Sequence, residues 1–317
     1  MKTILYTRYG SPDVLHLREV ATPTPKADEV LVKIHAAGAN PLDWHLMRAK
    51  PFLVRLDGGL RKPKNHRLGA DIAGRVEAVG TNVTTLRPGD EVFGDLSAAG
   101  LGGFAEYVCV RADSLVLKPA NLSFESAAGV PVAGITALQG LRTGNLSAGQ
   151  KVLINGASGG VGTFAVQIAK AFGAEVTAVC SGANKAMVQS IGADHVIDYT
   201  QEDFTRNGRH YDLILEVIGN RTPADLRRAL SPEGVCVVVG FTTLARMFNV
   251  MLRGGKTVRM MGTAKPNQAD LAILKDLLES GKVTTVIDRC YTLSETPEAI
   301  RYLESGRAKG KVIIVMG

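Results

Sequence analysis

The second half of the chain alternates short apolar runs with segments whose apolar residues recur at helical spacing. The pattern predicts strands at 151–155, 175–179, 195–197, 212–217, 235–239 and 257–261, and helices at 161–172, 184–191, 223–230 and 268–280. The run Val235–Val239 is apolar throughout, as expected for a strand buried on both faces. Such alternation predicts a parallel, doubly wound α/β sheet.

The first third of the chain has a different pattern. Short strand-like segments at 30–35, 72–79 and 107–110 are separated by many Pro and Gly residues, which predicts a small β-barrel. Near residue 121 the pattern changes, and Ser123 is predicted to cap a helix. The last residues predict a strand at 286–292, a helix at 295–305 and a final strand at 311–316.

One glycine-rich turn joins a predicted strand to a predicted helix. It is the sequence Asn155-Gly-Ala-Ser-Gly-Gly-Val-Gly162, in which Ala157, Gly159 and Gly162 match the spacing G-x-G-x-x-G with Ala in the first place. Glycines allow the backbone to approach a pyrophosphate closely, and the helix N-terminus offers free N–H groups to it. A turn without a ligand is the alternative, which the strand–helix–strand context disfavours. The turn therefore predicts a dinucleotide and hydride transfer.

Length and composition narrow the class of protein. The chain has 317 residues, enough for two domains, and it is 45% hydrophobic and 21% charged, as in globular proteins. It has no run of eighteen apolar residues, and it does not begin with the basic and then apolar segments of a signal peptide. A cytoplasmic protein without stable membrane insertion is therefore expected. The four cysteines are far apart (Cys109, Cys180, Cys236 and Cys290), which favours reduced thiols and argues against a clustered structural zinc site.

Most of the net charge of +7 lies in one segment. Residues 48–67 hold seven Lys and Arg residues against the single acid Asp57, and so carry +6. Such a segment attracts a cofactor phosphate, nucleic acid or an acidic membrane surface, or is simply a solvated loop. Few aromatic residues are interleaved, so nucleic acid is not expected as a partner. Its apolar residues suggest a cover over the mouth of an active site (Phe52, Leu53, Val54 and Leu56).

Several segments, in order along the chain, resemble the medium-chain dehydrogenase/reductase superfamily, and are most similar to its zinc-independent quinone oxidoreductases, related to ζ-crystallin. The matching segments are 69–74, 88–94, 103–108, 133–137, 156–162, 191–194, 196–199 and 309–312. The resemblance implies a GroES-like catalytic domain at 1–120, a Rossmann NADPH-binding domain at 121–280 and a C-terminal return to the catalytic domain at 281–317. It also implies a homodimer or tetramer, of which we expect the homodimer. Residues 50–67 are longer and more basic than the corresponding link in the family.

The resemblance also bears on metal chemistry. Zinc-dependent members have a Cys where the segment 37–44 has none, and a His where this chain has Ala70. A catalytic zinc needs about three protein ligands, and the nearby His35, His45 and His66 are not at the ligand positions of the family. We therefore expect no metal.

Without a metal, the reaction that fits is hydride transfer to a quinone or an α,β-unsaturated carbonyl. Asn40 matches the family's Asn near the nicotinamide ribose and substrate, and its amide can donate to an oxyanion. Asp43 is the second catalytic candidate, with a helix cap as the alternative. Asp71 and Trp44 are expected to be structural partners. The proton donor stays open, because Tyr107 has suitable chemistry but is better explained as a core aromatic.

The end of the second strand of the glycine-turn unit favours NADPH over NADH. No Asp or Glu follows Val179, whereas Ser181 and Lys185 can bind a 2′-phosphate. An exposed lysine without a ligand is the alternative for Lys185. The resemblance adds further residues to the turn in the expected cofactor site, which comprises Asn40, Thr136, Ala157, Ser158, Gly159, Gly160, Val161, Gly162, Ser181, Lys185, Tyr199, Val217, Gly240, Phe241 and Lys311.

These observations predict an NADPH-dependent, zinc-independent reductase of a small electrophilic molecule, either a quinone or an α,β-unsaturated carbonyl. An alcohol or aldehyde dehydrogenase of the same superfamily is one alternative, which the missing metal ligands disfavour. A cofactor-binding protein with little turnover is the other, since binding and catalysis use the same turn. The sequence does not indicate which acceptor is used.

Overall fold

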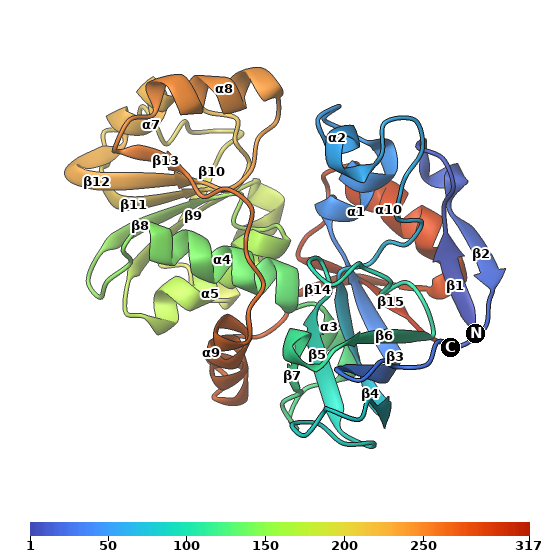
Figure 1. Ribbon diagram of the computed structural model, residues 1–317. Coiled ribbons are helices and arrows are strands. Elements are labelled where there is room, and N and C mark those ends of the chain that lie inside the picture. The colour runs from blue at the N-terminus through green and yellow to red at the C-terminus, as the bar shows by residue number, and fades with distance from the viewer. The chain divides into compact units, whose positions relative to one another are not determined.

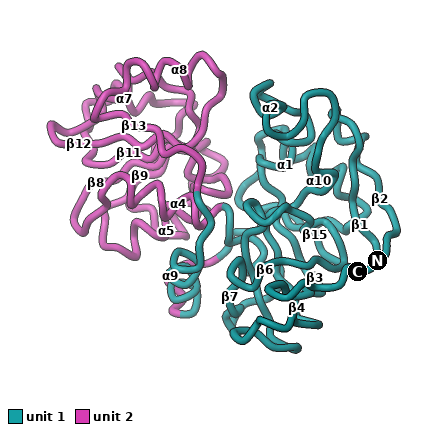
Figure 2. The backbone as a smooth tube through the Cα atoms, in the orientation of Figure 1, with its two compact units in different colours: residues 1–132, 265–279, 285–317 teal, residues 133–264, 280–284 magenta.

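The chain folds into two compact units in a computed structural model that describes residues 1–317 (Figure 1). Unit 1 comprises residues 1–132, 265–279 and 285–317, and unit 2 comprises residues 133–264 and 280–284 (Figure 2). None of the helices has the length and apolar character needed to cross a membrane.

Unit 2 is built on a six-stranded parallel sheet with the strand order β10-β9-β8-β11-β12-β13. Helices α4 and α5 lie on one face of this sheet, and α7 and α8 lie on the other (Figure 1). Its strands are β8 (Lys151–Asn155), β9 (Glu175–Cys180), β10 (His195–Asp198), β11 (Tyr211–Glu216), β12 (Leu230–Val238) and β13 (Val258–Met260). Its helices are α4 (Pro131–Thr143, whose first two residues belong to unit 1), α5 (Gly160–Ala171), α6 (Lys185–Ser190), α7 (Pro223–Arg228) and α8 (Leu244–Arg253).

The doubly wound sheet predicted from the apolar runs is confirmed. All six predicted strands form, because their central residues are apolar and become buried between the two helix layers. Strand order reverses between β8 and β11, so the carboxyl ends of these strands open at the point where such sheets bind ligands.

Unit 1 is built on a mostly antiparallel sheet with the order β14-β15-β3-β4-β5-β7, and β6 also pairs with β3. Its strands are β1 (Lys2–Leu5), β2 (His16–Glu19), β3 (Glu29–Ala39), β4 (Asp71–Val79), β5 (Glu91–Asp95), β6 (Tyr107–Arg111), β7 (Leu115–Leu117), β14 (Ile287–Thr292) and β15 (Lys311–Val315). Its helices are α1 (Pro41–Arg48), α2 (Val54–Gly58), α3 (Phe124–Ala128), α9 (Gln268–Glu279) and α10 (Thr296–Glu304).

The C-terminal segment completes the sheet of unit 1. Strand β15 pairs antiparallel with β3, so the last residues of the chain add a strand beside the N-terminal part of the sheet. The predicted cap of α3 is also confirmed, because Ser123 Oγ accepts a hydrogen bond from the Ser126 N–H at 3.2 Å. One apolar core joins β1, α1, α10 and β15, and Trp44 packs against it.

Candidate functional site

The glycine turn lies between β8 and α5, as its sequence predicts. Gly156 has φ +90°, a conformation that other residues rarely adopt. A Cβ on Gly162 would lie 2.7 Å from Ala157 Cα and would also strike the Gly156 carbonyl, whereas one on Gly159 would meet nothing closer than 3.6 Å. Gly162 thus allows α5 to pack against the turn, while Gly159 leaves its outer side open.

The N-terminus of α5 has the chemistry of an anion site. Gly159 is its N-cap residue and offers no side-chain acceptor. The first N–H groups of a helix have no acceptor within the helix, and they carry a partial positive charge. The turn is therefore able to hold a phosphate group.

Most of the predicted cofactor residues of unit 2 gather at the carboxyl edge of the sheet. Besides the turn after β8, these are Ser181 and Lys185 after β9, Tyr199 after β10, Val217 after β11, and Gly240 and Phe241 after β12. The side chains of Lys185 and Tyr199 are exposed, and the latter retains 58% of its accessible surface. The buried Thr136 lies on α4 instead, outside these strand ends.

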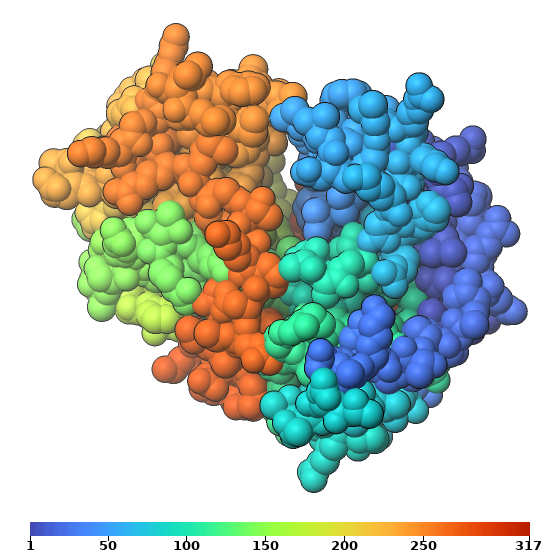
Figure 3. All heavy atoms as spheres, viewed as in Figure 1, coloured from blue at the N-terminus to red at the C-terminus, as the bar shows by residue number.

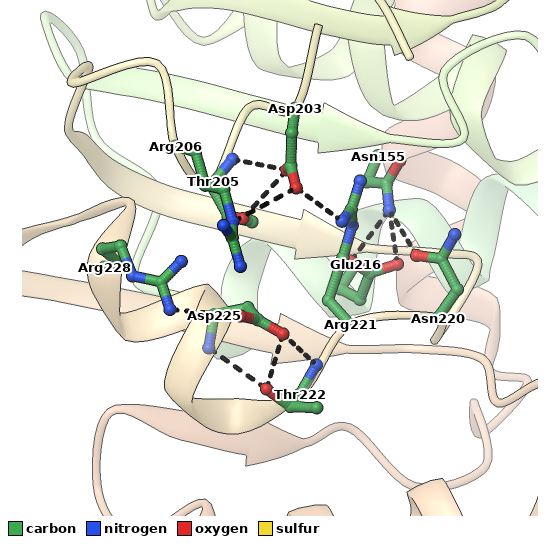
Figure 4. Close-up of polar contacts among 10 residues, drawn as sticks. All are labelled: Asn155, Asp203, Thr205, Arg206, Glu216, Asn220, Arg221, Thr222, Asp225 and Arg228. Carbon is green, nitrogen blue, oxygen red and sulfur yellow. Dashed lines mark hydrogen bonds and ion pairs between the residues drawn. The ribbon is translucent and has the colours of Figure 1, made fainter. Parts of the chain in front are cut away.

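A buried pair of side chains braces this edge. Asn155 Nδ2 donates to both carboxylate oxygens of Glu216, at 2.8 and 2.9 Å, and lies 3.3 Å from Asn220 Oδ1 (Figure 4). Glu216 Oε1 also accepts the N–H groups of Ile218 at 3.1 Å and Gly219 at 2.8 Å. The pair therefore ties the glycine turn to the turn that contains Val217.

Glu216 has no exposed surface, and burial raises the pKa of its carboxyl group, against the opposing effect of the bonds from Asn155 and Gly219. Arg221 lies nearby, but its guanidinium is bonded to Asp203 at 3.0 Å (Figure 4). Sequence reasoning missed Glu216, although an acid at the end of a predicted buried strand was the available signal.

Two further contacts surround the expected 2′-phosphate position. Asn184 Nδ2 donates to Ser158 Oγ at 3.1 Å and so connects the glycine turn to the segment after β9. The Asp198 carboxylate lies against Gly182 and accepts the Thr200 N–H at 2.9 Å. The turn after β9 has no acidic residue of its own, but Asp198 at the end of the neighbouring strand β10 lies beside it. The sequence pattern did not indicate this contact.

In unit 1, Asn40, Asp71 and Lys311 form a buried triad. Lys311 Nζ donates to Asn40 Oδ1 at 2.6 Å and to Asp71 Oδ2 at 3.2 Å. Asn40 Nδ2 donates to Asp71 Oδ2 at 2.9 Å and to the Gly38 carbonyl at 3.2 Å. Exchanging the two ends of the amide would set Nδ2 against the ammonium and Oδ1 against the carboxylate, so the contacts fix its orientation.

The expected catalytic residue Asp43 lies in the same region with a local role. Its carboxylate accepts the N–H groups of Asn40 and Gly69, each at 2.8 Å, and so joins the start of α1 to the segment before β4. Burial raises the pKa of Asp43 to about 7, despite these two bonds. Burial also raises the pKa of Asp71, which Lys311 and Asn40 counteract.

The structure thus gives Lys311 two acceptors inside unit 1. Its side chain is only 3% exposed, and Asn40 only 2%. Asp71 acts as a structural partner of Asn40, from which it accepts a hydrogen bond. Trp44 stacks on His45, with ring centroids 3.6 Å apart. The site residues fall in two groups, one in unit 1 (Asn40, Asp43 and Lys311) and one in unit 2 (the carboxyl-edge residues and Thr136).

The donor side chains of the chain do not form a metal site. No group of three or more His, Cys, Asp or Glu side chains is arranged to hold a metal ion. Ala70, where a ligand would be needed, has no donor atom.

Comparison with known proteins identifies the family of the chain. The family model of the alcohol dehydrogenase GroES-like domain matches residues 26–120, and that of the zinc-binding dehydrogenases matches residues 191–314. The 2-methylene-furan-3-one reductase of Solanum lycopersicum is 37% identical over 99% of this chain and 79% of its own length. The chloroplastic NADPH-dependent alkenal/one oxidoreductase of Arabidopsis thaliana is 34% identical, with the same coverage. Among solved structures, the quinone oxidoreductase from Coxiella burnetii has a TM-score of 0.89 and 32% identity, and 99% of each chain is covered.

The fold, the carboxyl-edge site and these relatives define an oxidoreductase that uses a nicotinamide cofactor. The chain belongs to the medium-chain dehydrogenase/reductase superfamily, and within it to the quinone oxidoreductases.

Proposed function

We propose that this protein is an NADPH-dependent reductase of quinones or α,β-unsaturated carbonyls that works without zinc. The observation that carries the proposal is the carboxyl edge of unit 2. There the glycine turn opens on the uncapped N-terminus of α5, and the turn after β9 presents Lys185 and has no carboxylate of its own, although Asp198 of the neighbouring strand lies beside it. Relatives named as reductases of alkenals, furanones and quinones support the substrate class.

The nicotinamide would supply the hydride, and the chain would bind and orient the cofactor. The turn at 156–162 would hold the pyrophosphate on backbone N–H groups. Lys185 and Ser181 would hold the 2′-phosphate by charge-assisted hydrogen bonds, with Tyr199 beside the adenosine. Val217, Gly240 and Phe241 would lie along the nicotinamide half.

Asn40 is proposed to orient the acceptor, and the triad indicates how. Lys311 and Asp71 fix the amide, so one Nδ2 proton always points at the carboxylate. The other proton is on the Gly38 carbonyl, in the longer bond of 3.2 Å, and it is the one that a substrate oxygen could take over. We therefore assign Lys311 to positioning Asn40, in place of the cofactor contact expected from the resemblance.

The zinc-free reaction is supported by the donor set. Asn40 and Ala70 supply no thiolate and no imidazole, and hydride transfer to an electron-poor carbon does not require a Lewis acid. We further propose a homodimer, since β13 is a sheet edge that can pair with a second copy. We place the protein in the cytoplasm, where its four free cysteines stay reduced.

The function is tested by following the oxidation of NADPH with 1,2-naphthoquinone, 9,10-phenanthrenequinone and a panel of enones. Turnover with these acceptors, unchanged by chelators, supports the proposal. NADPH binding without turnover would favour a binding protein. Zinc bound stoichiometrically, with oxidation of alcohols, would favour the alcohol dehydrogenase alternative.

The choice of cofactor is tested with two variants, one that removes a positive charge and one that removes a negative charge. Lys185→Ala should weaken NADPH by about tenfold and leave NADH almost unchanged, because only the 2′-phosphate loses a charged donor. Asp198→Asn removes the nearby negative charge and should leave NADPH as tight or tighter. Equal losses for both cofactors in Lys185→Ala, or an Asp198→Asn variant that loses only NADH, would contradict the assignment.

A further inference from the structure

The basic segment, residues 50–67, presents apolar and cationic side chains together on the surface of unit 1 (Figure 3, light blue). Four large apolar side chains are strongly exposed, namely Phe52 at 60%, Leu53 at 47%, Leu56 at 63% and Leu60 at 60%. The sequence suggested that residues of this segment cover an active site. Of the four residues named for that role, Phe52, Leu53 and Leu56 are exposed on unit 1, and Val54 is partly buried.

The basic segment is held in a defined conformation. Tyr9 Oη donates to the Gly59 carbonyl at 2.7 Å, and the Lys64 N–H donates to the Gly58 carbonyl at 2.7 Å. The Arg55 guanidinium lies 5.0 Å from the centre of the Tyr9 ring, in cation–π contact. The apolar side chains are therefore displayed by a fixed backbone.

The cations of the basic segment have no counterions in the protein. Five exposed cations form no ion pair with a carboxylate (Lys50, Arg61, Lys62, Lys64 and Arg67). The only acid in the segment is Asp57. An uncompensated charge of this size is complementary to an anionic surface.

The combination distinguishes between anionic partners. A nucleic acid would use the cations, but it would leave the leucines in water, and Phe52 is the only Phe, Tyr or Trp of the segment on which a base could stack. An anionic bilayer uses both, because lipid phosphates attract the cations while apolar side chains enter the region between headgroups and acyl chains.

We propose that the basic segment docks the protein reversibly on an anionic lipid surface. Phe52, Leu53, Leu56 and Leu60 enter the interfacial region, and the five cations lie against lipid phosphates. The docking is peripheral, and it does not depend on the proposed reductase function.

Sedimentation of the full chain with lipid vesicles tests this inference. Vesicles containing about 30 mol% phosphatidylglycerol should bind it at least tenfold more tightly than phosphatidylcholine vesicles, and binding should fall steeply between about 50 and 300 mM NaCl. No binding to the anionic vesicles would overturn the proposal.

Two double variants separate the two contributions. Phe52→Ser with Leu56→Ser should weaken vesicle binding by about tenfold at unchanged charge. Arg61→Glu with Lys62→Glu should weaken it further and reduce the salt dependence. All four residues are exposed or on a surface turn, so the fold should persist, which circular dichroism checks.

Matched controls change the same chemistry elsewhere. Leu252→Ser removes an apolar side chain that is 83% exposed on α8, and Arg18→Glu with Arg209→Glu changes the net charge by the same amount. Both should bind as the wild type. Equal losses in the controls would overturn the proposal.

Two further outcomes would replace the lipid by another partner. If single-stranded DNA binds as tightly as the vesicles and Phe52→Ser with Leu56→Ser changes nothing, the segment is a general polyanion site. If these substitutions instead convert a dimer into a monomer by light scattering, the segment is an interface between copies. Either result would contradict docking on lipid.

Discussion

Replacing Lys311 by Met tests the buried triad of unit 1. Met keeps an unbranched apolar stem but removes the ammonium group, so the fully buried Asp71 carboxylate retains only Asn40 Nδ2 and the Val132 N–H. Removing one partner of a buried ion pair destabilises a protein by about 3–5 kcal/mol. The double variant Lys311→Met, Asp71→Asn removes both charges and should recover at least half of this cost.

The chain offers a reporter and a control for this experiment. Trp44 is the only tryptophan and packs against the core of unit 1 that contains Val312, so its fluorescence during urea unfolding reports on that unit. Lys309→Met changes an exposed lysine two residues away and should cost no more than about 0.5 kcal/mol. The affinity for NADPH should stay within about twofold in Lys311→Met, because Lys311 is assigned to Asn40 and not to the cofactor.

Three results would contradict this account of Lys311. A cost for Lys311→Met as small as that for Lys309→Met would mean that the ion pair is not formed in the folded protein. Costs that simply add in the double variant would mean that Lys311 and Asp71 do not interact. A large selective loss of NADPH affinity would instead return Lys311 to the cofactor site.

Three other variants probe the remaining features. Gly162→Val places a side chain against Ala157 and should weaken NADPH at least about tenfold in a fluorescence titration, whereas wild-type affinity would contradict the packing. Asn155→Leu leaves Glu216 without its side-chain donor, so it should lower the free energy of unfolding by about 1–3 kcal/mol and weaken NADPH and NADH equally; a loss confined to NADPH would argue against a brace. Burial raises the pKa of Asp95 to about 6, above the value of 3.8 in an unfolded chain, so wild-type stability falls as pH rises through this window. Asp95→Asn lacks this loss, so its free energy of unfolding should rise by about 3 kcal/mol relative to wild type between pH 3.8 and pH 6. Urea unfolding of both proteins across this range measures the difference, and parallel pH profiles would contradict the raised pKa of Asp95.

The sequence predicted the sheet of unit 2 well because its strands are apolar and local in pattern. The helix α4 was not predicted, since Gly134, Gly140 and Gly144 near and within it lower helix propensity. Tertiary packing compensates at Gly140, where a Cβ would come within 2.8 Å of Leu215 Cδ1. The short helix α1 was missed because eight residues give too few turns for a clear period.

The candidate site was predictable where its chemistry lies within one short segment. The glycine turn belongs to such a segment, and its spacing was sufficient to predict its place between β8 and α5. The bond between Asn155 and Glu216 joins residues 61 positions apart, and the one between Asn40 and Lys311 joins residues 271 positions apart. Only strand order brings such residues together, and no local pattern specifies that order.

The central claim is that the glycine turn and the segment after β9 hold the phosphates of NADPH. Hydrogen–deuterium exchange of the full chain, with and without saturating NADPH, tests it most directly. The account predicts slower amide exchange in peptides that cover 156–162 and 181–185, with NADH protecting mainly the first. NADPH that binds by fluorescence but leaves the exchange of both peptides unchanged would contradict it.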